Sequence, residues 1–270
     1  MARLTVTLLA LFLYSSQVTA WTTTSTFENG TPGTQAVGSD AFGYAFKYTV
    51  FTSDIAHTGK KSAQVGIKSG TDGWGDWGGS FHFPSKLYEG DEIWFRTYIY
   101  YPKDFDFTAS GRGMKTMRIH KSSKSGENEG YFDVLRSNEG GALTIGSEFL
   151  GVQGDRINLG DVVPKGTWQA YEMYVKFSSV SGGGIYRVWQ NGKLIFEDTA
   201  SRTLTSSSSK ADFIYMWTYW NGKAPKTQNA YIDDVVITSD KPGQRDSHGN
   251  PYIGLVGGTI TSPPKPPEIK

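Results

Sequence analysis

The 270-residue chain has no cysteine, which excludes a disulfide framework, thiol catalysis and a cysteine-ligated metal. It also lacks an excess of charge: 27 Lys and Arg stand against 26 Asp and Glu, so nothing in the charge balance favours nucleic-acid binding. No segment keeps a helical 3.6-residue period between capping residues, and no internal repeat is present. These absences exclude a coiled coil and a helical bundle.

The first 20 residues have the pattern of a secretory signal peptide. A positive start with Arg3 precedes an almost wholly apolar run at 4–13, and the small residues at 18–20 suit a cleavage site. The apolar run is too short to span a bilayer, and no later segment is apolar enough to do so. We therefore expect a secreted protein that begins near Trp21 and has no membrane partner.

Aromatic residues and glycine are abundant: 14% of the chain is Phe, Trp or Tyr, and 33 residues are Gly. This composition is typical of many short strands joined by turns. The pair Asn191-Gly192 predicts a tight hairpin, because both residues tolerate positive φ. Alternating patterns predict strands at 46–53, 62–67, 77–83, 92–101, 113–120, 168–177, 185–190, 194–198, 212–220 and 230–239. Their spacing predicts an all-β, antiparallel jelly-roll sandwich.

Three of these strands carry faces suited to a sugar polymer, because successive side chains point to opposite faces of a strand. Aromatic rings stack on sugar rings, and arginine pairs with carboxylates through two hydrogen bonds. We therefore expect the three faces to line one concave groove. The faces are Trp94, Arg96, Tyr98 and Tyr100; Thr116, Arg118 and His120; and Tyr215, Trp217 and Tyr219.

A cationic stretch runs from residue 107 to residue 126, where no Asp or Glu occurs. In a chain with almost no net charge, this stretch predicts a local positive field that suits a substrate carrying carboxylates. Its members are Arg112, Lys115, Arg118, His120, Lys121 and Lys124.

Residues 90–102, 115–120 and 231–236 together resemble the jelly-roll, concanavalin A-like polysaccharide lyases of the glucuronan-lyase and alginate-lyase type. Arg118-Ile119-His120 is similar to the Gln-Ile-His strand of one alginate-lyase family, with Arg in place of Gln. The strand with Tyr215 and Tyr219 comes late in the chain, as the catalytic tyrosine strand does in such lyases, but lacks their Tyr-Lys-x-Gly-x-Tyr pattern. The resemblance implies β-elimination on a uronate-containing glycan.

β-Elimination needs a group that neutralises the uronate carboxylate, a base and an acid. Candidates for neutralisation are Arg96, Arg118 and Lys115. Candidates for base and acid are His120, Tyr219 and Tyr215, with the order left open. Candidates for stacking on the substrate are Trp94, Tyr98, Tyr100 and Trp217.

Two other functions use the same residue types. A non-catalytic carbohydrate-binding module would need the rings but not the cations and His120. A β-sandwich glycoside hydrolase would need two spaced carboxyl groups, and the Glu-x-Asp-x-x-Glu pattern of laminarinase-like enzymes is absent. No nucleophile elbow, phosphate loop or His-Glu-x-x-His motif is present either.

A structural calcium ion is expected from a second resemblance. Glu28 near the mature start, Gly59 in a turn and Asp233 on the last strand resemble the calcium clasp of carbohydrate-binding sandwiches. Calcium prefers carboxylate and carbonyl oxygens, which these positions supply. The alternative is that these are ordinary turn carboxylates.

The expected organisation has three parts: a signal peptide at 1–20, a β-jelly-roll domain that carries the chemistry at 21–243, and an extension at 244–270 that ends in a proline-rich tail. The expected partner is an anionic polysaccharide, a polyuronate, bound by a monomer.

Overall fold

The computed structural model describes residues 19–108, 113–136, 141–149 and 152–256. Residues 1–18 of the expected signal peptide, the proline-rich tail and Arg112 lie outside them. The described part of the chain contains strands and turns and no helix, so no helix in it is long and apolar enough to cross a membrane.

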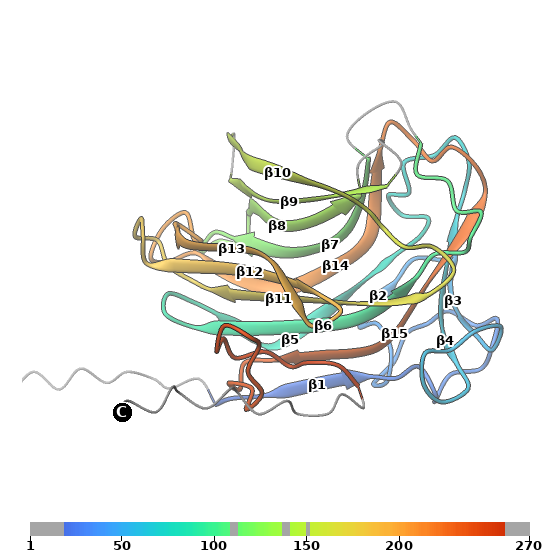
Figure 1. The fold of residues 1–270 in the computed structure, drawn as a ribbon, viewed down its shortest axis with the longest axis horizontal. Helices are drawn as coiled ribbons and strands as arrows, with labels where there is room; N and C mark the ends of the chain where they lie inside the picture. The colour runs from blue at the N-terminus through green and yellow to red at the C-terminus, as the bar shows by residue number, and fades with distance from the viewer. Residues whose placement is uncertain (1–18, 109–112, 137–140, 150–151, 257–270) are drawn as a thin grey trace, which may run out of the picture.

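Two antiparallel sheets form a sandwich (Figure 1), which confirms the predicted all-β fold class. The β6 sheet has the order β13-β12-β11-β6-β15-β4-β3, with β1 also on β15. Its strands are β1 Thr22–Ser25, β3 Thr49–Thr52, β4 Ser62–Ile67, β6 Glu92–Tyr100, β11 Trp168–Lys176, β12 Gly184–Gln190, β13 Lys193–Ser201 and β15 Gln228–Thr238. The β7 sheet has the order β10-β9-β8-β7-β14-β5-β2. Its strands are β2 Tyr44–Ala45, β5 Gly79–Leu87, β7 Gly113–Ser122, β8 Asn128–Arg136, β9 Ala142–Phe149, β10 Val152–Val162 and β14 Lys210–Asn221.

The ten predicted strands all correspond to strands of the structure, with the largest boundary differences at β3, β5 and β13. Asn191 and Gly192 both adopt positive φ, 50° and 76°, in the hairpin between β12 and β13. Five strands were not predicted: β1, β2, β8, β9 and β10. The omission matters because β8 lies beside β7, the strand that carries Arg118 and His120.

One apolar core fills the space between the sheets. Phe95 of β6 lies 6.4 Å from Phe81 of β5, and Phe132 of β8 lies 5.2 Å from Tyr186 of β12, ring centre to ring centre. The alternation in β6 is as predicted, with Ile93, Phe95 and Ile99 in this core. Each sheet therefore has one face in the core and one outer face, and the outer faces are where the expected site residues must be sought.

Candidate functional site on the outer face of the β7 sheet

The pairing of β7 with β14 decides which side chains reach the outer face. Ile119 pairs with Ile214 and Met117 with Met216, and all four belong to the core. The alternate pair, Arg118 and Tyr215, therefore lies on the outer face.

Irregular pairing between β7 and β14 changes the faces of their central residues. Trp217 has a φ of 50° and is fully buried in the core, where its Nε1–H donates to the hydroxyl of Tyr101 at 3.2 Å. The prediction that Trp217 stacks on substrate is therefore wrong. Thr116 also turns inward, with its hydroxyl 3.5 Å from that of Tyr101.

The same irregularity brings Lys115 and Tyr219 together on the outer face. Lys115 pairs with Tyr219, and its ammonium lies 5.1 Å from the centre of the Tyr219 ring. Strict alternation along β7 predicts Lys115 on the core face with Met117, and the structure shows that this prediction is wrong. The bulge thus places Lys115, one of the predicted cations, on the outer face.

Arg118 lies at the centre of this face and is enclosed by aromatic rings. Its guanidinium carbon lies 4.4 Å from the ring centre of Tyr131 and 5.4 Å from that of Tyr215. One terminal nitrogen donates to the hydroxyl of Thr218, while Nε has no hydrogen-bond partner among the described residues. The residue is only 3% exposed and this Nε is itself buried; a guanidinium with one unpaired donor beside stacking rings has the chemistry to pair with a carboxylate that reaches it.

The carboxylate of Asp212 holds the ring of His120. Its Nδ1 lies 2.6 Å from Oδ1 of Asp212, and the hydroxyl of Ser122 donates to Oδ2 at 3.0 Å. The ring of Phe213 stacks on the imidazole, with centres 4.2 Å apart and planes 10° apart. With the carboxylate accepting from Nδ1–H, the lone pair of the imidazole is on Nε2, the tautomer that a base needs.

Four site residues were missed by sequence reasoning: Tyr131, Asp212, Phe213 and His82. Tyr131 lies on the unpredicted strand β8 and pairs with His120. The alternation of Phe132 and Val134, both in the core, was a signal that could have identified β8 and placed Tyr131 on its outer face. His82 pairs with Phe213 and is exposed, with Nε2 3.1 Å from the hydroxyl of Ser80.

The two tyrosines around Arg118 remain protonated at neutral pH. Burial raises the pKa of Tyr215 and of Tyr131, and the positive charge of Arg118 opposes this with a smaller effect. A phenolate base is therefore disfavoured at either position, and a phenol that can donate a proton is favoured.

The other predicted face lies on the opposite side of the molecule. Trp94, Arg96, Tyr98 and Tyr100 belong to β6, hence to the outer face of the β6 sheet. The prediction that Arg96 shares a groove with Arg118 is wrong, and so is the placement of the three rings there. A strand pattern shows that residues share a face but not which sheet the strand joins.

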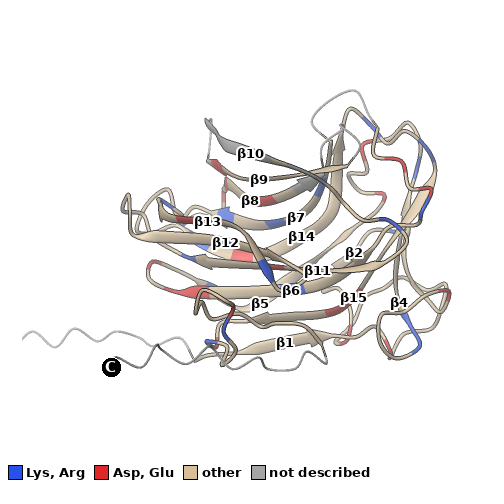
Figure 2. Ribbon diagram, in the orientation of Figure 1, with Lys and Arg blue, Asp and Glu red and all other residues tan. Residues whose placement is uncertain are grey.

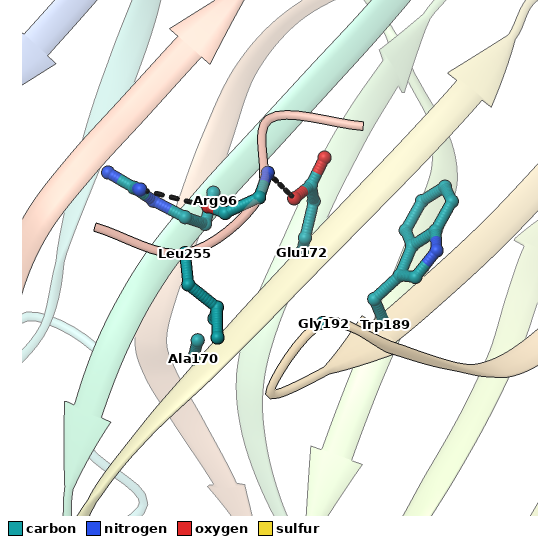
Figure 3. Close-up of a pocket in the computed structure, with 7 residues that line it drawn as sticks. Arg96, Ala170, Glu172, Trp189, Gly192 and Leu255 are labelled. Atoms are coloured by element: carbon teal, nitrogen blue, oxygen red, sulfur yellow. Dashed lines mark hydrogen bonds between the residues drawn. The ribbon is translucent and has the colours of Figure 1, made fainter. Parts of the chain in front are cut away.

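That face is covered by residues 244–256, here named the strap (Figure 3). Arg96 donates to the carbonyls of Gly254 at 3.0 Å and Asp234 at 3.1 Å. The Glu172 carboxylate accepts from the amides of Ile253 at 2.6 Å and Gly254 at 3.1 Å. Arg96 therefore has a structural role in holding the strap.

Two more predicted side chains hold the same strap. Trp94 donates through Nε1 to the Pro251 carbonyl at 3.0 Å, and the hydroxyl of Tyr98 accepts from the Val256 amide at 2.8 Å. Tyr100 lies beyond the strap contacts, 5.5 Å from the ring of Trp168. None of these groups is free to face a polymer lying on the β7 sheet.

The positive charge of residues 107–126 is partly balanced by acidic residues from other parts of the sequence. Figure 2 shows basic residues on β7 and acidic residues on the neighbouring strands. Lys121 is fully buried, and burial lowers its pKa to about 7 although Asp133, Glu129 and Glu148 act in the opposite direction. The outer face is therefore cationic at Arg118 and Lys115, not along the whole stretch.

The expected calcium ligands lie around one loop. Glu28 accepts from the amides of Lys60 and Lys61, both at 2.8 Å, and Asp233 accepts from the amide of His57 at 2.8 Å. A Cβ on Gly59 would collide with the Glu28 carboxylate, so this carboxylate needs glycine opposite it.

The oxygen atoms here are of the types that calcium binds, because two carboxylates lie beside a loop of backbone carbonyls. No group of three or more acidic or histidine side chains gathers there or elsewhere in the described part of the chain. The ammonium of Lys61 already contacts the carbonyls of Glu28 and Gly30, at 2.7 and 2.8 Å. Calcium would need further carbonyls or water to complete its shell.

An all-β sandwich with a cationic, aromatic outer face has the groups that can stack on sugar rings and pair with carboxylates. The chain belongs to the polysaccharide lyase family: the family model described as "Polysaccharide lyase" matches residues 18–236. It is a lyase by this membership. No protein with a curated description matches the sequence.

Solved structures share the fold at low sequence identity. The alginate lyase vAL-1 from Chlorella virus is 18% identical, with 73% of this chain and 90% of that chain covered and a TM-score of 0.55. The endo-beta-1,4-glucuronan lyase from the fungus Trichoderma reesei is 11% identical, with 80% and 94% covered and a TM-score of 0.54. A mutant of alginate lyase Aly36B in complex with alginate tetrasaccharide is 14% identical, with 80% and 96% covered and a TM-score of 0.56. These likenesses confirm the jelly-roll fold.

Proposed function

We propose that this lyase is secreted and cleaves a uronate-containing polysaccharide by β-elimination on the outer face of the β7 sheet. The observation that carries the proposal is Arg118, which lies between two tyrosine rings with an unused donor and next to the His120–Asp212 pair. The family supports a lyase, and the similar alginate and glucuronan lyases, one of them bound to alginate, support a uronate.

In the proposed reaction, Arg118 binds the uronate carboxylate and stabilises the negative charge that develops when the neighbouring carbon loses its proton. Nε2 of His120 takes that proton, with Asp212 holding the ring in the required tautomer. The electron pair forms a carbon–carbon double bond, and the bond to the 4-linked sugar oxygen breaks. Tyr215, protonated because burial raises its pKa, donates the proton that this oxygen needs.

Tyr219 and Lys115 lie further along the same face and are proposed to contact the substrate. Their mutual contact holds the ammonium over the ring, so the pair offers one cation and one stacking surface. A structural calcium ion at Glu28, Gly59 and Asp233 is part of the same proposal. It would hold the loop at residues 57–61 and take no part in the chemistry.

The decisive experiment incubates the purified protein with polyuronates and with neutral glucans. We expect ultraviolet absorbance from the new conjugated double bond with at least one polyuronate and with no glucan. New reducing ends without that absorbance would indicate a glycosidase. Binding without either product would indicate a carbohydrate-binding module, and the proposed site would then lack its chemical role.

A further inference from the structure

A row of aromatic rings continues from Tyr215 of the proposed site, away from Arg118 and His120. The ring of Trp74 lies 5.9 Å from that of Tyr215, Phe46 lies 6.0 Å from Trp74, and Tyr44 lies 5.3 Å from Phe46. Trp74 is 58% exposed and Tyr44 is 53% exposed. Large rings left this open in a connected row are unusual for a surface without a ligand.

The loop that carries Trp74 is firmly attached to the sandwich. The carbonyl of Asp72 accepts from the amide of Trp220 at 2.7 Å, and that of Thr71 accepts from the amide of Ala224 at 2.9 Å. Trp77 is fully buried beneath the loop, and a Cβ on Gly73, at φ 89°, would collide with its ring. The loop therefore buries one tryptophan as an anchor and presents the other to solvent in a fixed place.

Two lysines lie beside this row and are matched by two carboxylates. Lys47 follows Phe46, and its side chain is 63% exposed; its ammonium lies 4.6 Å from the ring centre of Tyr48. The ammonium of Lys68 lies 4.2 Å from the same ring. Two carboxylates lie at the same end: that of Asp76 is 3.7 Å from the Lys47 ammonium, and that of Asp72 accepts from the amide of Trp74 at 3.2 Å, so the lysines balance them.

We propose that Trp74 and Tyr44 form a distal binding subsite for the same polyuronate chain, on sugars beyond those that contact Arg118. The subsite makes the enzyme favour long chains and cleave them internally. This inference rests on the proposed function, since it takes the substrate of the Arg118 site as its occupant. The row is continuous with that site, and its exposed rings can stack on the sugars of the polymer.

The test measures cleavage of a polyuronate polymer and of a series of its oligosaccharides by wild type, W74A and Y44A. We expect KM for the polymer to rise about tenfold in W74A, with kcat almost unchanged and the shortest substrate unaffected. The matched control is W168A, which removes a partly exposed tryptophan from the outer face of the opposite sheet. It should leave KM unchanged.

Equal KM values for W74A and wild type on the polymer would overturn the inference. So would an equal loss on short and long substrates, since that would place Trp74 at the cleaved bond. If wild type cleaves no polyuronate, the proposed function fails first. Electrophoresis through gels containing the polymer then tests the subsite alone: retardation of wild type but not W74A supports it, and equal mobility overturns it.

Discussion

On β7, the role of Arg118 depends on the shape of its side chain as well as on its charge. Arg118 uses its planar guanidinium against two rings and Thr218, a geometry that a lysine ammonium cannot reproduce. We expect R118A to reduce kcat/KM by about 10²-fold or more, and R118K to recover only a small part, because the charge is kept and the paired donors are lost.

A matched control for R118A exists on the other sheet. Arg187 lies over the ring of Tyr174, 5.3 Å from its centre, and pairs with Glu197. R187A removes a cation from a tyrosine ring in the same way but away from the proposed site. Steady-state rates on the preferred polyuronate compare the two, and similar losses in both variants would contradict the role of Arg118.

Asp212 is a positioning residue, because it acts through His120. In D212N an amide replaces the carboxylate that accepts from Nδ1–H, so the imidazole can turn its protonated nitrogen towards the substrate. We expect kcat to fall by up to the 10²–10⁴-fold that a general base typically contributes, with KM little changed. Nitrogen-15 shifts of the His120 ring should show the change of tautomer directly.

Two further variants separate positioning from general damage to the fold. D212E keeps a carboxylate and should restore part of the activity and the wild-type tautomer. S122A removes the second hydrogen bond to Asp212 and should cost less than D212N. An unchanged tautomer in an inactive D212N enzyme would show that Asp212 does not work through His120.

Glu172, which holds the strap, makes the stability of the folded protein depend on pH. Burial raises the pKa of Glu172 from its ordinary 4.5 to about 8, against the opposing effect of two amide hydrogen bonds and Arg96. Between these values the folded state holds a proton that the unfolded state has released. Stability therefore falls as pH rises from about 4.5 towards 8.

We expect the melting temperature to fall by several degrees across this range, and E172Q, which cannot ionise, to reduce the fall. In calcium-free buffer, burial also raises the pKa of Asp233 to about 7, so the slope measured there should not vanish in E172Q. E127Q, an exposed change on the loop before β8, should leave the slope as in wild type. A slope equal in wild type and E172Q would show that Glu172 does not titrate in this range.

The loop at residues 57–61 supplies the prediction for calcium. An ion bound only to the folded state stabilises it by mass action, so a chelator should lower the melting temperature by several degrees. E28Q should remove that dependence, because it deletes a proposed ligand charge at the loop. If wild type melts at the same temperature with and without chelator after prolonged dialysis, Lys61 and the amide hydrogen bonds hold the loop without a metal.

For the whole molecule, the two outer faces differ: the face of the β7 sheet carries the proposed chemistry, and the face of the β6 sheet is covered by the strap. Trp94 and Trp189 are almost fully buried under it, and burying one large side chain stabilises a fold by about 1.5–3 kcal/mol. Truncation after Gly243 should therefore lower the melting temperature by about 10 °C and increase binding of an apolar dye.

Truncation after Val256 is the control, since it keeps every strap contact described above and removes only the residues that follow. It should melt as the full chain does. If truncation after Gly243 were equally harmless, the strap would contribute little to stability, and the hydrogen bonds of Arg96 and Glu172 would have to be replaced by water at no cost.

The fold class can be predicted from the sequence alone, because the alternation of apolar side chains and the turn residues are local properties. The sequence also indicates which side chains share a face within one strand: Trp94, Arg96 and Tyr98 do lie together. The hairpin at Asn191 follows from the same local chemistry. Arg118 and His120 were identified because charge and residue type can be read along one strand.

Which sheet each strand joins depends on long-range pairing, and this pairing separates Arg96 from Arg118. One irregularity lies in the β7–β14 pairing between Met216 and Tyr219, and another lies in the β7–β8 pairing between Lys115 and Met117. Trp217 is therefore buried and Lys115 lies on the outer face, although alternation predicts the reverse. Asp212 reaches His120 from 92 positions away. Such contacts depend on register between strands that are distant in sequence, and a pattern within one strand carries no information about that register.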